Sequence, residues 1–103
     1  MRFGLSDTVI SELQGVCRRH QNIQELLIFG SRAKGNYRER SDLDVAAIGN
    51  NLDYNQLLSI LIEIDDLELL YQVDLLDYQK HADTPIGEHI DRVGQVFYQS
   101  VQA

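Results

Sequence analysis

Two aspartates separated by a single residue, Asp42 and Asp44, begin the apolar stretch DLDVAAI of residues 42–48. The stretch predicts a buried strand. Because alternate strand residues face the same side, both carboxylates project from one face while Leu43 points into the core. Like charges at this separation repel each other unless a cation lies between them, and hard carboxylate oxygens suit Mg²⁺. The pair therefore indicates a metal site; two solvated residues at the start of a strand are the alternative.

A turn that could hold a phosphate precedes these aspartates. The apolar run ELLIF ends at Gly30 and Ser31. At such a strand-to-helix turn, backbone N–H groups and a hydroxyl can face one anion, and glycine lets a phosphate approach the backbone. Arg32 and Lys34 follow and are candidates to neutralise a polyphosphate. The plainer alternatives are an ordinary turn and two solvated loop cations.

A third acidic candidate lies in the apolar segment YQVDLLDY of residues 71–78. Asp74 stands in its middle, where an aspartate among apolar residues is costly unless it is paired or bound to a metal. Asp77 is nearer the end of the segment and is explained as a solvated residue. We therefore expect Asp74, and not Asp77, to join the two earlier aspartates.

The elements that must position these residues follow from hydrophobic periodicity and turn signals. Helices are expected from Ser6 to about His20, over residues 54–65 and over residues 84–93, and strands over residues 25–30, 42–48 and 71–78. The segment GQVFYQ of residues 94–99 fits either a last strand or a continued helix. Alternating helices and strands in a short chain imply an α/β (α+β) fold, in which helices pack on a small mixed sheet.

Composition predicts one folded domain that spans residues 1–103. Hydrophobic residues make up 44% of the chain and charged residues 24%, close to the globular average. The net charge of −7 disfavours passive nucleic-acid binding, so phosphate chemistry would need local cations or metal ions. The sole cysteine, Cys17, cannot form an intramolecular disulfide and is expected in the core. Because no segment resembles a signal peptide or a membrane span, we expect a cytoplasmic protein.

His20, His81 and His89 lie far apart in the sequence without ligand spacing, so no histidine metal site is expected. The predicted helix over residues 54–65 carries more leucine and isoleucine than one buried face requires. Core packing explains most of this excess, and contact with a partner is a candidate explanation for the rest.

Taken together, Gly30-Ser31, Asp42-x-Asp44 and the later Val-Asp-Leu strand resemble the signature of the DNA polymerase β superfamily of nucleotidyltransferases, and most closely its minimal nucleotidyltransferase (MNT) proteins. The resemblance extends from about residue 6 to residue 99 and implies a polymerase-β-like fold. It implies that Asp42, Asp44 and Asp74 bind two Mg²⁺ ions, with Asp74 helping to activate the attacking hydroxyl. Gly30 and Ser31 would hold the phosphates of a nucleoside triphosphate, with ATP expected. One departure is Val93, which stands where many relatives carry glutamate.

The resemblance also implies a partner. Free-standing MNT proteins are typically paired with a helical HEPN-type protein, and in the toxin-antitoxin version the MNT protein transfers AMP to a tyrosine of the HEPN ribonuclease. We therefore expect an antitoxin-like protein adenylyltransferase. Two alternatives are a binding module that neutralises a HEPN partner without chemistry and a nucleotidyltransferase for a small molecule such as an antibiotic. The short chain disfavours the latter, because a small domain offers little concave surface for a second substrate.

Overall fold

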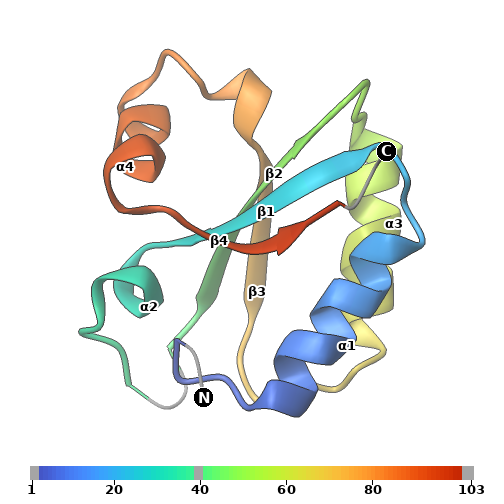
Figure 1. The fold of residues 1–103 in the computed structure, drawn as a ribbon, viewed down its shortest axis with the longest axis vertical. Helices are drawn as coiled ribbons and strands as arrows, with labels where there is room; N and C mark the ends of the chain where they lie inside the picture. The colour runs from blue at the N-terminus through green and yellow to red at the C-terminus, as the bar shows by residue number, and fades with distance from the viewer. Residues whose placement is uncertain (1–2, 39–40, 101–103) are drawn as a thin grey trace.

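The computed structural model describes residues 3–38 and 41–100, in which helices pack on a four-stranded sheet (Figure 1). Along the chain the elements are α1 (Asp7–Arg18), β1 (Ile23–Phe29), α2 (Ser31–Lys34), β2 (Leu43–Gly49), α3 (Tyr54–Asp65), β3 (Val73–Asp77), the 3₁₀ helix η1 (Tyr78–Lys80), α4 (Pro85–Val93) and β4 (Gln95–Gln99). Within the described ranges, no helix is long and apolar enough to cross a membrane.

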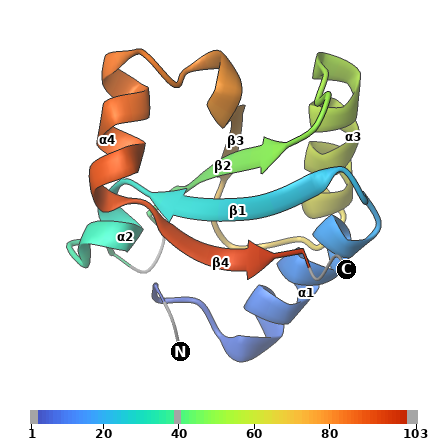
Figure 2. The same cartoon turned by 45° about the horizontal axis from the view of Figure 1, so that its top comes forward.

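The sheet has the strand order β3-β2-β1-β4. Strand β1 runs antiparallel to β2 and β4, whereas β2 and β3 are parallel and are joined through α3. Figure 2 shows β1 in the middle of this sheet, with β4 along its outer side. The expected mixed sheet with packed helices is confirmed. The last segment, which fitted either a strand or a helix, is a strand because it pairs along β1.

Side chains on the two faces of the sheet form two cores of different size. Helices α1 and α3 lie side by side on one face (Figure 1), where they cover the larger core. Helix α4 covers a smaller cluster on the other face, built on Phe29, Ala46 and Ile90. Because strand side chains alternate, Asp44 shares the α4 face with Ala46, and Asp74 shares it with Leu76. The thinly covered face therefore carries the acidic residues.

Three α-helices begin with a side-chain cap. Ser6 accepts a hydrogen bond from the backbone N–H of Val9, and Asp53 and Thr84 cap α3 and α4 in the same way. Such caps satisfy backbone donors that the first helical turn leaves free.

The cysteine is a core residue, as expected. Cys17 is buried on the inner side of α1. Burial disfavours the thiolate and raises the pKa of Cys17 to about 12, and the negative charge of Glu63 adds to this effect. The thiol is therefore unreactive at neutral pH.

A buried arginine joins several segments beside the sheet. Arg32 on α2 is only 1% exposed. Its Nη1 donates to the carbonyl of Phe3 at 2.8 Å, and its Nη2 and Nε donate to the carbonyl of Ser41 at 2.9 and 3.2 Å. Its guanidinium also lies 5.3 Å from the ring centroid of Tyr37 and 4.5 Å from that of Tyr71, within cation–π range. The side chain thus fixes α2 against the segment that enters β2.

Replacing this arginine should test its structural role. Because lysine cannot reproduce the planar fork and its stacking, Arg32→Lys should lower the free energy of unfolding by about 2–4 kcal/mol. Urea denaturation followed by circular dichroism would measure this change. Lys34→Met, an exposed substitution on the same helix, should change it by less than about 0.5 kcal/mol. Equal stabilities of Arg32→Lys and the wild type would contradict the anchoring role.

Candidate functional site

The candidate site lies where β1 ends and where β2 and β3 begin. In the antiparallel register of β1 and β2, Phe29 stands opposite Asp44. In the parallel register of β2 and β3, Asp44 stands opposite Asp74. Gly30 directly follows Phe29, and Asp42 directly precedes β2. Three strands therefore bring the glycine turn and the three aspartates to the same end of the sheet, where Leu43 is buried.

The negative charges of Asp42 and Asp74 both act on the carboxyl group of Asp44. The pKa of Asp44 is raised, first because partial burial disfavours its charge and then because Asp74 and Asp42 are negatively charged neighbours. A hydrogen bond shared with Asp74 raises it further, since one of the two groups must carry the proton. The sequence prediction that these residues lie together is therefore supported by the geometry of the site.

The donor set has the chemistry of a site for a hard cation. Carboxylates that repel one another lose that penalty when a divalent ion binds between them, and oxygen ligands suit Mg²⁺. Over residues 3–38 and 41–100, no group of three or more His, Cys, Asp or Glu side chains is already arranged around a metal position. The aspartates would therefore adjust their side chains to hold one.

Gly30 occupies a backbone conformation that other residues avoid. Its φ of 76° and ψ of −153° lie in a region that is essentially restricted to glycine. A Cβ atom at this position would also overlap Oδ2 of Asp44. The sequence suggested that glycine admits a phosphate; the structure shows in addition that it admits the Asp44 carboxylate. The turn and the acid are therefore packed against each other.

The three polar side chains of α2 that follow this turn differ in their burial. Ser31 is half-buried at the start of α2, and Lys34 is exposed at its end. The expectation that Arg32 neutralises a polyphosphate does not fit the structure, because its guanidinium is buried against the carbonyls of Phe3 and Ser41. Nearness in sequence to the turn does not determine which side of a one-turn helix a side chain takes.

The two aspartates of β3 differ from expectation in their burial. Asp74 is exposed, because β3 is an edge strand and the α4 face is open at its start. Asp77, which was explained as solvated, is only 4% exposed. Its carboxylate accepts a hydrogen bond from the backbone N–H of Gln79 at 3.0 Å and caps η1. Asp77 is thus a structural cap, and Asp74 is the one opposite Asp44.

A histidine near the site was missed by sequence reasoning. His89 on α4 packs edge-on against Phe29, with ring centroids 6.3 Å apart, and when protonated it opposes the rise in the pKa of Asp44. No local signal could have found it, because only the packing of α4 on the sheet brings it here. Val93, on the same helix, packs against the small core cluster and supplies no carboxylate.

Comparison with solved structures supports the fold. A chain of a toxin-antitoxin complex crystallised with AMP-PNP superposes with a TM-score of 0.71, at 23% identity over 95% of this chain and 77% of that chain. A chain of the MntA-HepT toxin-antitoxin gives a TM-score of 0.67, at 18% identity over 92% and 74%. A putative nucleotidyltransferase from Sulfolobus solfataricus gives 0.57, at 17% identity over 100% and 93%. A search of curated proteins finds no match.

The family is shown by the sequence itself. The family model described as "Polymerase beta, Nucleotidyltransferase" matches residues 11–103, which include the glycine turn and all three aspartates. The chain therefore belongs to the polymerase beta nucleotidyltransferase family.

Proposed function

We propose that this protein is a cytoplasmic nucleotidyltransferase that transfers AMP from ATP to a tyrosine hydroxyl of a helical HEPN-type partner, and that it acts as the antitoxin of that pair. The observation that carries the proposal is the meeting of Asp42, Asp44 and Asp74 beside the Gly30 turn. Family membership supports nucleotidyl transfer. The fold similarity to toxin-antitoxin chains, one of them crystallised with AMP-PNP, supports the nucleotide and the partner.

Each residue of the site has a task in this reaction. Asp42, Asp44 and Asp74 would hold two Mg²⁺ ions, which when bound stabilise the attacking and leaving oxygens of an in-line displacement at the α-phosphorus. The exposed Asp74 carboxylate would also orient the tyrosine hydroxyl and accept its proton. The hydroxyl then forms the new bond to phosphorus, and the bond to pyrophosphate breaks.

The residues around the turn bind and position the nucleotide. Backbone N–H groups of the turn at Gly30 and the hydroxyl of Ser31 would hold the triphosphate, and the exposed ammonium group of Lys34 would offset part of its charge. Arg32 acts indirectly as a positioning residue, because its bonds to the carbonyls of Phe3 and Ser41 hold α2 in place.

Transfer can be tested by intact mass spectrometry of the proposed HEPN-type partner. Incubation with wild-type protein, Mg²⁺ and ATP should add AMP to the partner, whereas the Asp42→Asn/Asp44→Asn variant should add none, because the charge that holds the metal is lost. Asp83→Asn, an exposed substitution in the loop before α4, should transfer normally.

Either of two results would change the conclusion. Equal transfer by the double variant and the wild type would show that the site is assigned wrongly. A tight complex without any mass gain would favour a binding module that neutralises its partner without chemistry.

Metal dependence can be followed without measuring transfer. With Mg²⁺ and AMP-PNP at about 100 times the dissociation constant, the wild type should gain about 2.7 kcal/mol of stability, seen as a higher melting temperature. EDTA should abolish this gain, and Asp44→Asn should not show it. Without metal, Asp44→Asn should be at least as stable as the wild type, because one of the repelling charges is gone. The same gain in EDTA would exclude a metal-dependent nucleotide site.

The requirement for glycine at the turn offers a matched pair of substitutions. Gly30→Ala should lower the free energy of unfolding by about 1–3 kcal/mol and weaken AMP-PNP binding. The added Cβ would overlap the Asp44 carboxylate, and alanine disfavours the positive φ of this position. Gly15→Ala, at an open position within α1, should raise stability by about 0.5–1 kcal/mol and leave binding unchanged. Unchanged stability and binding in Gly30→Ala would count against the packing of turn and acid.

A further inference from the structure

Helix α3 exposes a row of apolar side chains on the side away from the core. Tyr54, Leu58 and Ile62 recur at every fourth position, and these residues are 71%, 43% and 57% exposed. Residues at this spacing lie on one face of a helix. The buried residues of the same helix, Ile60 and Ile64, face the sheet. We call the three exposed residues the α3 stripe; their exposure exceeds what core packing requires.

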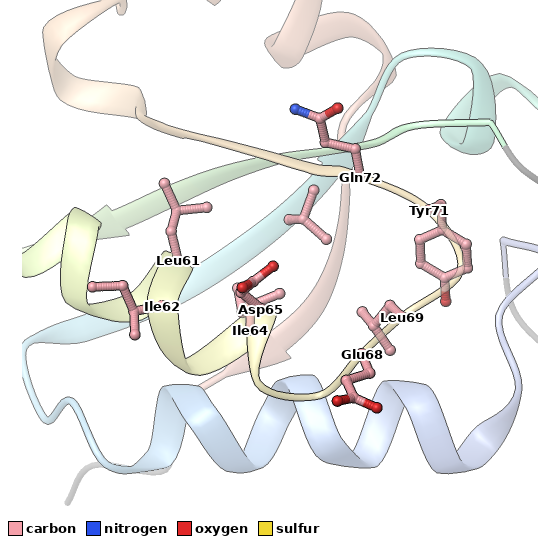
Figure 3. Close-up of a pocket in the computed structure, with 9 residues that line it drawn as sticks. Leu61, Ile62, Ile64, Asp65, Glu68, Leu69, Tyr71 and Gln72 are labelled. Atoms are coloured by element: carbon pink, nitrogen blue, oxygen red, sulfur yellow. The ribbon is translucent and has the colours of Figure 1, made fainter.

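The α3 stripe leads into a groove between the end of α3 and the start of β3 (Figure 3). This α3 groove has a volume of about 460 Å³. Its lining residues come from α3, from the following loop and from the start of β3: Leu61, Ile62, Ile64, Asp65, Glu68, Leu69, Tyr71, Gln72 and Val73. Ile62 belongs to both features, so the stripe and the groove are continuous with each other.

The charged side chains that line the α3 groove are all acidic. Asp65 and Glu68 line it, and Asp66 is exposed beside it. Among the described lining residues there is no Lys, Arg or His, and none of these three carboxylates forms an ion pair with a described residue. The whole chain carries a net charge of −7. An occupant that supplies cations would therefore relieve the repulsion along this rim.

We propose that the α3 stripe and the α3 groove are the docking surface for the helical partner, which binds through an apolar helix face flanked by lysine or arginine. This inference rests on the proposed partnership and adds where the partner binds and with what chemistry. Helix-in-groove binding uses apolar residues at helical spacing, as on the α3 stripe. A second copy of this chain is a poorer occupant, because a two-fold contact would bring two acidic rims together.

The α3 groove is also connected to the candidate site. Tyr71 and Val73 form part of its wall and lie on the segment that leads directly into Asp74. The ring of Tyr71 lies 4.5 Å from the Arg32 guanidinium, which holds the carbonyl of Ser41 just before Asp42. A partner in the groove would therefore contact Val73 at the start of β3, the strand that carries Asp74. It would also contact Tyr71, which packs on Arg32.

The test compares two substitutions on exposed helix surfaces. Leu58→Asp places a charge in the α3 stripe, whereas Ile86→Asp makes a similar change on α4, where Ile86 is 39% exposed on the other face of the sheet. Calorimetric titration with the HEPN-type protein should show that Leu58→Asp raises the dissociation constant at least about tenfold and that Ile86→Asp does not. Circular dichroism melting of both variants would verify that they fold.

Reversing the charge of the acidic residues in the α3 groove is a second test of the docking surface. Asp65→Lys/Glu68→Lys should weaken partner binding about tenfold and reduce its sensitivity to added NaCl, because cation attraction is replaced by repulsion. Unchanged or tighter binding would overturn the proposal of a basic flank.

The outcomes separate this inference from the proposed function. Wild-type affinity in Leu58→Asp would overturn the docking surface and leave the partnership intact. A wild-type chain that forms no complex would remove both. If sedimentation shows a wild-type dimer that Leu58→Asp dissociates while partner binding is unchanged, the occupant is a second copy and the proposal is wrong.

Discussion

The pairing of β2 with β3 places the carboxyl groups of Asp44 and Asp74 side by side, and the surrounding structure accommodates this constraint. The register is held by backbone hydrogen bonds and by the apolar rows behind the acids, so the side chains cannot separate by strand slippage. Partial burial, followed by repulsion from Asp74 and Asp42, raises the pKa of Asp44 and disfavours its charged form. Gly30 leaves the space that the Asp44 carboxylate occupies. Carboxylates that are held together and have a shifted pKa are typical of functional sites.

The buried Arg32 shows how the chain stabilises the end of the sheet that carries the aspartates. A charge without solvent is costly unless hydrogen bonds compensate, and here carbonyls of Phe3 and Ser41 accept from the guanidinium while aromatic rings pack on it. These contacts connect the start of the described chain, the glycine turn and the entry to β2. The buried guanidinium therefore holds α2 against the entry to β2, whereas Lys34 on the same helix is exposed.

The two faces of the sheet differ in how much apolar core they carry and in which residues they expose. The larger core, beneath α1 and α3, supplies most of the packing, while the thin α4 face keeps the carboxylates accessible and adds His89 beside them. The outer side of α3 carries the exposed apolar residues of the α3 stripe, and acidic residues line the neighbouring α3 groove. Tyr71 lies between these regions, since it lines the groove and contacts Arg32.

The sequence by itself determined the family signature, the main elements and the grouping of Asp42, Asp44, Asp74 and Gly30, because strand alternation, capping residues and turn glycines are local properties of the chain. Only the tertiary structure decided that Arg32 is buried, that Asp77 is a cap while Asp74 is exposed, and that His89 lies near Asp44. These three outcomes depend on which strand is at the edge and on how helices pack across the sheet. Such contacts join residues far apart in sequence, and local patterns do not encode them.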